Sequence, residues 1–562
     1  MRVARRRHLR GPLPGISGHA GRAAARVARA ARGRAARGDH APARPARSPR
    51  AAHDGRSREV PARRAAGRSR RARGARRARH RGRRAGAGLG AGRWQARGGG
   101  AAVVRICRDH EPGGAREATR VPEHLVDRVR GGAVTSRRPV YVRGVGAFTP
   151  LAASWPATAR LLAGGACAIR EITAFDATGF PCRVAAAIDR REPSAGGGDP
   201  DGSAGGAGGS APRGIEQGFS EEDRRLPYAR RAAREAWDMA GVSPAPGRLG
   251  VFVGAESGRG RWQTVLGLAR AAGGAAGAFD HARFAREARA FAERIDASMT
   301  SPSSVAAALA QDFGAHGPVE TVSLACASGS AAIVEAVRAI RLGECDVALC
   351  GGVGADVDPL MLAGFGLLGI LSPRGVSCPF DAHRDGFVVG EGAAMLVVAA
   401  DRGDAAVELA GIGRSLDAHH LTAPDPEGEG AARAMTAALR DAGIGEVGYV
   451  QAHGTSTPLN DRIEVAAIRR VLGAAVERAH VSSSKGALGH WIAGAGALGA
   501  LYAWEAVARG RVLPTAGLTN PDPTCDVAHV IGRAVDKDVV AALANSFAFG
   551  GANSCLVLRR AA

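Results

Sequence analysis

From Leu249 onward, apolar residues fall alternately into short runs and into helical spacing. The runs Leu249–Val253, Val319–Ala325 and Asp346–Cys350 are short and contain mainly Val, Leu and Ala, which is typical of buried strands. Between the last two runs, apolar residues recur at helix spacing over Ser330–Leu342, and Gly343 ends the predicted helix. Strands that alternate with helices in this way predict an α/β protein with a buried sheet.

The alternation begins again after residue 400. A strand pattern near Val407–Ile412 is followed by a helix pattern near Gly430–Ala442 and by another strand pattern at Tyr449–Ala452. We therefore predict two similar α/β halves, 137–400 and 401–562, although the sequence itself shows no clear repeat.

Residues 1–136 differ from the rest in composition. They contain 36 Arg, no Lys and 8 acidic residues, a net charge of +28, whereas the other 426 residues hold 41 basic and 44 acidic groups. A segment with so little apolar periodicity cannot bury enough surface to offset chain entropy, so we predict a disordered extension. A basic arm for nucleic acid and an organelle transit peptide are the alternatives. In 193–214, 9 of 22 residues are Gly, which predicts a flexible loop.

Other features of the sequence exclude several classes of protein. No run of about 18 apolar residues occurs, so no transmembrane helix is expected. The first ten residues, MRVARRRHLR, lack the apolar core of a secretory signal. Nine scattered cysteines without a CxxC pair indicate neither a disulfide framework nor a zinc site. We expect a cytoplasmic protein without a bound metal.

Cys326 lies where a predicted strand runs into a predicted helix, and its neighbours are Ala, Ser and Gly. A helix N-terminus has unpaired N–H groups and partial positive charge, which favour a thiolate and lower the pKa of a thiol. A lone cysteine is more often a buried structural residue. In this position, however, Cys326 is also a candidate nucleophile.

Two histidines add to this candidate chemistry. His453 follows the strand pattern at Tyr449–Ala452 and opens the segment HGTSTP, and His490 precedes a helix of small residues. Together with Cys326 they form a nucleophile and two imidazoles. Lys485 is one of only two lysines beside 75 arginines, and a compact ammonium is not interchangeable with a guanidinium in a tight site.

These segments resemble a β-ketoacyl-acyl-carrier-protein synthase of the elongating Cys-His-His type. The resemblance rests on Cys326 with its flanks, HGTSTP at 453–458, the segment from Lys485 to His490, and NSFAFGGAN at 545–553, in that order. The segments Asp381, Arg384–Phe387 and Gly390–Gly392 also match the family pattern. The resemblance covers about residues 138–560.

What the resemblance implies about the fold is a thiolase-like protein. Two pseudo-repeated α/β halves would form a layered α-β-α-β-α sandwich. The chain would act as a homodimer or as a heterodimer with a homologous synthase. The reaction would be a decarboxylative Claisen condensation of an acyl thioester with malonyl carrier protein, in fatty-acid, polyketide or polyene biosynthesis. Substrates would be carried on the phosphopantetheine of an acyl carrier protein, with no cofactor of the enzyme's own. Because carrier proteins are acidic, a basic patch near the pocket mouth is expected.

The resemblance also implies roles for individual residues. Cys326 would take the acyl group, and His453 and His490 would favour decarboxylation and stabilise the enolate. Lys485 would orient the histidines, with Glu464 as its partner.

Further roles concern the walls of the pocket. Thr455 and Thr457 would contact the pantetheine amides. The backbone N–H groups of Cys326 and Phe549 would form the oxyanion hole, and the Phe549 ring would close the acyl pocket.

Four features depart from the family pattern. The nucleophile is flanked as Leu-Ala-Cys-Ala, Ala548 replaces a usual Gly, Gly486–Leu488 replaces a more common Ser-Met segment, and Trp491 is bulkier than usual. None of them removes a catalytic group. Together they favour a specialised pathway, such as polyketide or polyene assembly.

Three alternatives remain. A non-catalytic chain-length partner of a synthase would typically lack the nucleophilic Cys that is present here. A thiolase would use a second Cys near the C-terminus, whereas Cys555 follows the NSFAFGGAN turn in a predicted strand. A nucleic-acid-binding role would depend on the basic extension.

Overall fold

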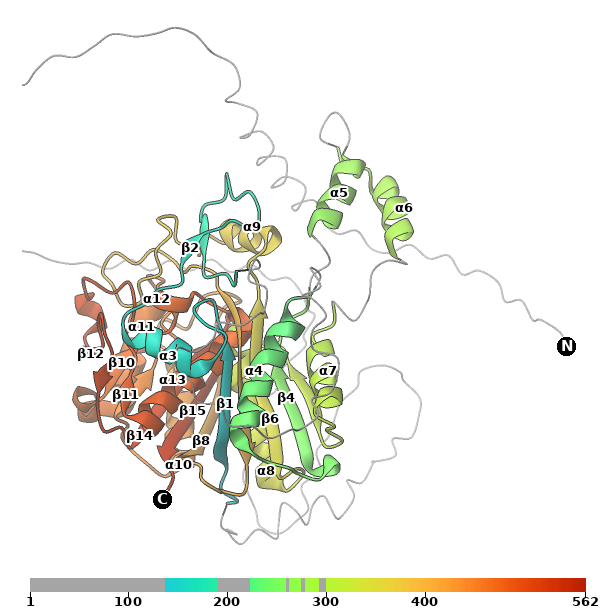
Figure 1. Cartoon of the computed structure of the whole chain (residues 1–562). Coiled ribbons are helices and arrows are strands. Elements are labelled where there is room, and N and C mark those ends of the chain that lie inside the picture. The colour runs from blue at the N-terminus through green and yellow to red at the C-terminus, as the bar shows by residue number, and fades with distance from the viewer. Residues whose placement is uncertain (1–136, 190–222, 259–261, 274–277, 293–299) are drawn as a thin grey trace, which may run out of the picture. The chain divides into compact units, whose positions relative to one another are not determined.

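A computed structural model describes residues 137–189, 223–258, 262–273, 278–292 and 300–562 (Figure 1). The predicted disordered extension at 1–136 and the predicted flexible loop at 193–214 lie outside these residues. In the described ranges, no helix is both long enough and apolar enough to cross a membrane.

The first half contributes five strands to a large sheet. Their order is β1-β7-β6-β4-β5, in which β7 is antiparallel to both β1 and β6, while β6, β4 and β5 are parallel. The strands are β1 (Tyr141–Phe148), β4 (Leu249–Gly254), β5 (Val319–Val322), β6 (Val347–Ala355) and β7 (Glu391–Ala399).

The second half repeats this arrangement. Its order is β8-β15-β14-β9-β10, in which β15 is antiparallel to both β8 and β14, while β14, β9 and β10 are parallel. The strands are β8 (Val407–Leu416), β9 (Tyr449–Gln451), β10 (His480–Ser482), β14 (Ala541–Phe547) and β15 (Ala552–Arg560). A short pairing of β1 with β8 joins the halves into one sheet of eleven strands, which ends at β12 (Ala528–His529).

Helices form three layers around the two halves of the sheet (Figure 1). In the first half α4 and α7 pack on the outer face, and in the second half α10 covers β8 and β15, with α11 packed against it. Between the halves lie α8 and α13, which contact each other and strands of both halves. The six helices are α4 (Arg225–Ala240), α7 (Ser304–Asp312), α8 (Ser328–Leu342), α10 (Glu429–Ala442), α11 (Asn460–Leu472) and α13 (Ala495–Arg509).

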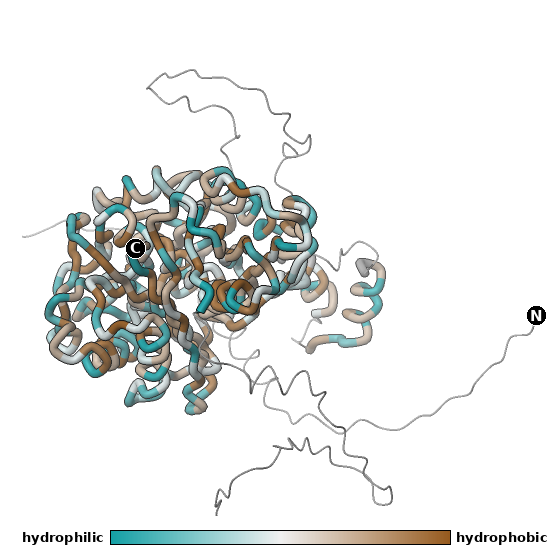
Figure 2. Tube along the Cα trace, turned by 90° about the horizontal axis from the view of Figure 1, so that it is seen from below, coloured by the Kyte–Doolittle hydropathy of each residue, from teal (hydrophilic) through white to brown (hydrophobic). Residues whose placement is uncertain are grey.

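The predicted layered α/β fold of two related halves is therefore confirmed. The strands β4, β7 and β14 bury every residue, as expected for strands that are covered on both faces, while the chain trace as a whole mixes hydrophobic and hydrophilic positions (Figure 2). The remaining elements are α3 (Trp155–Ala163), β2 (Arg170–Glu171), β3 (Val184–Ala185), α5 (Trp262–Ala272), α6 (His281–Ala292), α9 (Pro359–Leu367), α12 (Lys485–Leu488), β11 (Arg511–Val512) and β13 (Val535–Asp536).

The strand predicted at Val319–Ala325 ends earlier than expected. β5 stops at Val322, and Ala325–Ala327 forms a single 3-10 turn before α8. Ala325 has a φ of 46°, which a strand cannot accommodate. The apolar run in the sequence extends beyond β5 into this turn, and its pattern of apolar residues does not show where the strand ends.

Glycines on the first strand of each half reveal the repeat that the sequence hides. A Cβ on Gly146 of β1 would lie 2.2 Å from the Ala232 carbonyl oxygen of α4. In the same way, a Cβ on Gly413 of β8 would lie 2.1 Å from the Ala434 carbonyl oxygen of α10. In both halves a Gly-x-Gly strand thus allows an alanine-rich helix to approach the sheet backbone closely.

We predict that Gly413→Ala lowers the free energy of unfolding by about 1–3 kcal/mol, because the new methyl group pushes α10 away from β8. Chemical denaturation of the variant and of the unchanged protein measures the difference. Gly364→Ala is the matched control, since nothing lies within 4 Å of a Cβ at this position in α9. Equal stability of both variants would contradict the close approach.

Candidate active site

Cys326 lies in the turn between β5 and α8, at the edge where the parallel strands β4 and β5 both end. Its side chain is buried, with 7% of its surface exposed. The preceding Ala325 adopts a left-handed conformation, which turns the chain sharply from the strand into the helix. The sulfur therefore sits at the N-terminus of α8, as the sequence predicted.

Two buried carboxylates fix the loop that carries His453. Glu464 accepts hydrogen bonds from the backbone N–H groups of His453 and Gly454, both at 2.7 Å. Asp461 accepts from the N–H groups of Thr455 at 2.9 Å and Ser456 at 3.1 Å. Both carboxylates belong to α11, so this helix determines the position of the loop after β9.

Arg384 supports the same loop from the other side. It donates to the backbone carbonyl of Thr457 at 3.0 Å and forms an ion pair with Asp522 at 2.6 Å. The guanidinium is buried, so this contact is shielded from solvent. The segment Arg384–Phe387, which contributed to the family resemblance, thus helps to hold the loop that carries the histidine.

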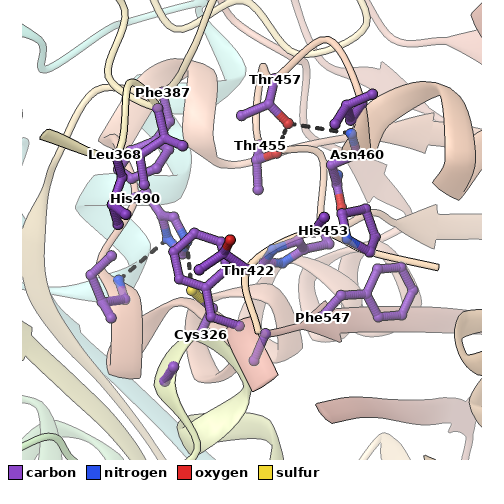
Figure 3. Close-up of a pocket in the computed structure, with 18 of the residues that line it drawn as sticks. Cys326, Leu368, Phe387, Thr422, His453, Thr455, Thr457, Asn460, His490 and Phe547 are labelled. Carbon is purple, nitrogen blue, oxygen red and sulfur yellow. Dashed lines mark hydrogen bonds between the residues drawn. The ribbon is translucent and has the colours of Figure 1, made fainter. Parts of the chain in front are cut away.

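His490 lies between α12 and α13, and its Nε2 is 3.1 Å from the sulfur of Cys326. Its Nδ1 accepts a hydrogen bond from the backbone N–H of Ile492 at 3.3 Å. Because Nδ1 is the acceptor, the proton of the neutral ring lies on Nε2. His490 therefore points an N–H donor at the sulfur (Figure 3).

Lys485 sets the orientation of the other histidine. Its Nζ donates to the backbone carbonyl of His453 and lies 3.4 Å from Nδ1 of the same residue. An ammonium donates and cannot accept, so Nδ1 of His453 is the acceptor and Nε2 carries the proton. The two imidazole rings lie 5.6 Å apart, and each bears its proton on Nε2.

Burial keeps both imidazoles neutral. Burial and the nearby Lys485 charge hold the pKa values of His453 and His490 well below the usual 6.5 for histidine. Burial also lowers the pKa of Lys485, to about 8, although the negative charges of Glu464 and Asp461, and of Cys326 when it is ionised, oppose this shift. At pH 7 the site therefore holds two neutral N–H donors beside one ammonium.

The sequence predicted a lowered pKa for the Cys326 thiol, and the structure corrects this. Burial raises its pKa to about 12, with further raising by Glu256 and Asp356, while the charge of Lys485 acts in the opposite direction. Loss of solvent outweighs the helix N-terminus because the thiolate is the charged form. The resting site therefore holds Cys326 as a thiol.

Glu464, predicted as the partner of Lys485, forms no hydrogen bond or ion pair with it among the contacts of the described residues. Its oxygens are used by the loop N–H groups and by the side chain of Asn545, at 3.1 Å. Its charge still raises the pKa of Lys485 through space. Glu464 thus acts on the lysine at a distance and on His453 by direct contact with its backbone.

A cavity of about 730 Å³ connects these groups (Figure 3). Cys326, His453 and His490 line it together with Thr455, Thr457 and Phe549, so the predicted site residues other than Lys485 share one cavity, with Glu464 also in its wall. The hydroxyls of Thr455 and Thr457 lie 2.9 Å apart and hydrogen bond to each other.

One wall of the cavity is apolar. It is built from α9, the segment after it, and residues near His490: Met361, Phe365, Leu368, Ile370, Phe387 and Ile492. Among the described lining residues there is no Arg or Lys, so the expected basic patch at the mouth does not belong to this lining. Leu368 and Leu459 line the cavity with about half of their surface exposed, 53% and 52%.

Two aromatic rings that the sequence analysis did not assign to the site hold the histidines. Phe387 packs edge-on against His490 with ring centroids 5.1 Å apart, and Phe547 packs against His453 at 5.7 Å. Both rings lie within family-like segments, Arg384–Phe387 and NSFAFGGAN. Their place in these segments could have marked both phenylalanines as site residues, but it could not show which histidine each ring contacts.

Two of the sequence departures do not face the cavity. Trp491 is fully buried between glycines, and a Cβ on Gly392 would lie 2.6 Å from its indole ring. Ala487 and Leu488 belong to the same hydrophobic core. Ala548, in contrast, lines the cavity with φ −130° and ψ 155°, an extended conformation that alanine adopts without strain.

Comparisons with known proteins match most of the described chain. Residues 137–402 match the model of the beta-ketoacyl synthase N-terminal domain, and residues 406–519 match that of the C-terminal domain. A 3-oxoacyl-[acyl-carrier-protein] synthase 2 from Synechocystis sp. is 42% identical over 262 residues. That match covers 44% of this chain and 63% of the relative, so the chain spans less than two thirds of its length.

Solved structures extend the similarity. The ishigamide ketosynthase/chain length factor is 31% identical with a TM-score of 0.63, and the match covers 76% of this chain and 100% of that one. A type II PKS acyl-carrier protein in complex with its ketosynthase, AntDE:AntF, matches at 26% identity and a TM-score of 0.62, over 76% of this chain and 100% of that chain.

The contacts of Glu464 lead to a stability prediction. Glu464→Ala leaves two buried backbone N–H groups without an acceptor, so we expect the free energy of unfolding to fall by roughly 2–4 kcal/mol. Denaturant unfolding measures this loss, with Glu477→Ala as control because the Glu477 side chain is 72% exposed. A change in Glu464→Ala no larger than in the control would show that these contacts do not support the loop.

Proposed function

We propose, because this chain belongs to the beta-ketoacyl synthase family, that it catalyses a decarboxylative Claisen condensation. An acyl group from one acyl carrier protein would be joined to malonyl carrier protein to give a β-ketoacyl product. One observation carries the proposal: a single cavity holds Cys326, with its sulfur 3.1 Å from Nε2 of His490, and the ring of His453 beside them.

The first step is acyl transfer to Cys326. The sulfur attacks the thioester carbonyl, a new S–C bond forms, and the S–C bond to the carrier's pantetheine breaks. The proton lost by the Cys326 thiol ends on the departing pantetheine thiol. Because burial raises the pKa of the free thiol, attack requires the Nε2–H of His490, the Lys485 charge and the α8 N-terminus to stabilise negative charge on sulfur.

The second step is decarboxylation of the malonyl group. The bond to the carboxylate carbon breaks, carbon dioxide leaves, and the electron pair moves into an enolate whose oxygen faces the two Nε2–H donors. Neutral imidazoles suit this role, because donors already aimed at a developing charge need no reorganisation. The enolate carbon then attacks the acyl-Cys326 carbonyl, a C–C bond forms, and the C–S bond breaks. The released thiolate of Cys326 takes a proton from solvent.

Two parts of the cavity wall suit two different parts of the substrate. The apolar wall near Phe365 and Phe387 suits an acyl chain, while the hydroxyls of Thr455 and Thr457 suit the amides of a phosphopantetheine arm. Acyl carrier protein is therefore the proposed partner, as it is for the ketosynthase of the AntDE:AntF complex. A second synthase-like chain, identical or homologous, is the other proposed partner.

The proposed chemistry moves electron pairs already present in the two thioesters, so it requires no redox cofactor of the enzyme's own. All eight cysteines in the described ranges are free thiols, which suits the reducing cytoplasm that we propose as its location.

A non-catalytic chain-length partner is the second candidate function. The ishigamide structure contains a chain length factor beside a ketosynthase. Against this role, the nucleophile and both imidazoles of this chain lie in one cavity with their protons directed into it. The nucleic-acid role proposed for 1–136 lies outside the described residues and stays a sequence-based alternative.

Acylation of Cys326 tests the proposed function. Incubation of the full chain with a panel of acyl carrier proteins should increase its intact mass by one acyl group, and the increase should be absent in Cys326→Ala. The panel should include saturated and polyene primers, since the favoured primer indicates the pathway. If no primer acylates the chain, even with a homologous synthase added, the condensation proposal is wrong.

The pH dependence of malonyl decarboxylation tests the protonation states. Because burial holds both imidazoles neutral, we expect no loss of rate between pH 7 and 6, where an ordinary histidine becomes charged. The rate should fall as the pH rises through about 8, where Lys485 loses the proton that orients His453. Lys485→Met should be slow at every pH, whereas Lys537→Met, the control, should keep the full profile. A loss centred near pH 6.5 without an alkaline loss would contradict this assignment.

A further inference from the structure

Glu256 lies beside the nucleophile but takes no part in the steps above. It comes two residues after the end of β4, and β4 is parallel to β5 with Gly254 opposite Val322. The N–H of Ala255 donates to the Val322 carbonyl at 3.1 Å, so the two chains stay together beyond the strands. Glu256 is thereby brought against the turn that carries Cys326.

The carboxylate of Glu256 contacts three groups of that turn. Its Oε1 accepts a hydrogen bond from the N–H of Ala325 at 2.8 Å and lies 3.0 Å from the hydroxyl of Ser328. Its Oε2 accepts from the hydroxyl of Ser323 at 2.9 Å. These groups lie on both sides of Cys326, so one side chain spans the whole nucleophile turn.

The turn needs such support because Ala325 has a φ of 46°. An alanine in this left-handed region is unfavourable and persists only where the surroundings fix it. A hydrogen bond from its N–H to a carboxylate is charge-assisted and correspondingly strong. Glu256 is itself fixed from behind, since buried Arg225 donates to its backbone carbonyl at 2.5 Å and pairs with Asp223.

The charge of Glu256 also reaches the sulfur. Several charged and titratable groups surround Cys326: Lys485, His453, His490, Glu256 and Asp356. The negative charges of Glu256 and Asp356 raise the pKa of Cys326, and Lys485 lowers it. At the N-terminus of α8, a carboxylate also offsets the partial positive charge that would stabilise a thiolate.

We propose that Glu256 is a positioning residue that fixes the left-handed turn before Cys326 and places negative charge beside its sulfur. The proposal rests on the proposed function only in taking Cys326 as the nucleophile. The carboxylate makes the free thiol of Cys326 less reactive, because its charge raises the pKa of the thiol. In return it fixes the geometry of the turn. Acyl transfer requires this geometry, whereas simple alkylation of the thiol does not.

Alkylation of Cys326 measures the charge effect separately from catalysis. The full chain is treated with iodoacetamide between pH 6 and 9, and modification of the Cys326 peptide is followed by mass spectrometry. In Glu256→Gln the amide oxygen can still accept the Ala325 N–H, but the charge is gone. We expect the alkylation rate at fixed pH to rise about three- to tenfold. Glu320→Gln, which removes an exposed carboxylate from the neighbouring β5, should leave the rate unchanged.

Acylation by carrier protein measures the positioning effect. We expect Glu256→Ala to acylate about tenfold more slowly or worse, because misplaced reacting groups lose rate steeply. Adding Ala325→Gly should restore much of this loss, since glycine adopts a positive φ without strain. The same Ala325→Gly change in the unaltered chain is the reference, and its gain in acylation rate should be smaller than the gain in Glu256→Ala.

The outcomes separate this inference from the proposed function. If no variant, including the unaltered chain, accepts an acyl group, the proposed function fails while the alkylation rates remain interpretable. An alkylation rate in Glu256→Gln equal to that of Glu320→Gln overturns the charge effect. Acylation of Glu256→Ala at the unaltered rate, or the same effect of Ala325→Gly with and without Glu256, overturns the positioning role.

Discussion

The close crossing of α8 and α13 is the constraint on which the site depends. A Cβ on Gly329 would lie 2.9 Å from both the Ala493 carbonyl oxygen and the Ala497 nitrogen, and one on Gly496 would lie 2.6 Å from the Ser330 nitrogen. Only glycines allow the two backbones to approach this closely. Because Cys326 precedes α8 and His490 precedes α13, this approach brings sulfur and imidazole to hydrogen-bonding distance.

The same packing determines the electrostatics of the site. Burial near the crossing shifts five groups toward their neutral forms: the pKa values of the Cys326 thiol and the Glu464 carboxyl rise, and those of His453, His490 and Lys485 fall. What remains is a set of fixed N–H donors and one ammonium, all buried beside the cavity. Such a site is poor at holding a free thiolate and well suited to a charge that develops only during reaction.

Sequence patterns predicted the elements, and the residues that meet in the cavity, for a physical reason. Buried strands, amphipathic helices and motifs such as HGTSTP are local, so they are readable along the chain. The end of β5 was misplaced because Ala325 is apolar, while its left-handed conformation is imposed by tertiary contacts. The direct contacts of Glu464 and the rings packed on His453 and His490 were also beyond reach, since they depend on strand register and helix position. The repeat was hidden because it lies in the order and directions of the strands and in close contacts between strands and distant helices, not in similar amino-acid sequences.

That repeat gives Glu256 a counterpart in the second half. β4 and β9 occupy equivalent places in the strand order, and Glu256 and His453 each come two residues after the end of their strand. Likewise β5 and β10 are equivalent, and the segments after them carry Cys326 before α8 and His490 before α13. The two halves thus contribute two side chains each from matching positions to one site. In the second half both are imidazoles that line the cavity, whereas in the first half one is Cys326, the proposed nucleophile, and the other is Glu256, which accepts hydrogen bonds from its turn. The equivalent ends of β4 and β9 can therefore serve different purposes. A carboxylate after β4 accepts hydrogen bonds from the backbone N–H of the neighbouring turn, whereas the Nε2–H of a neutral imidazole after β9 can only donate.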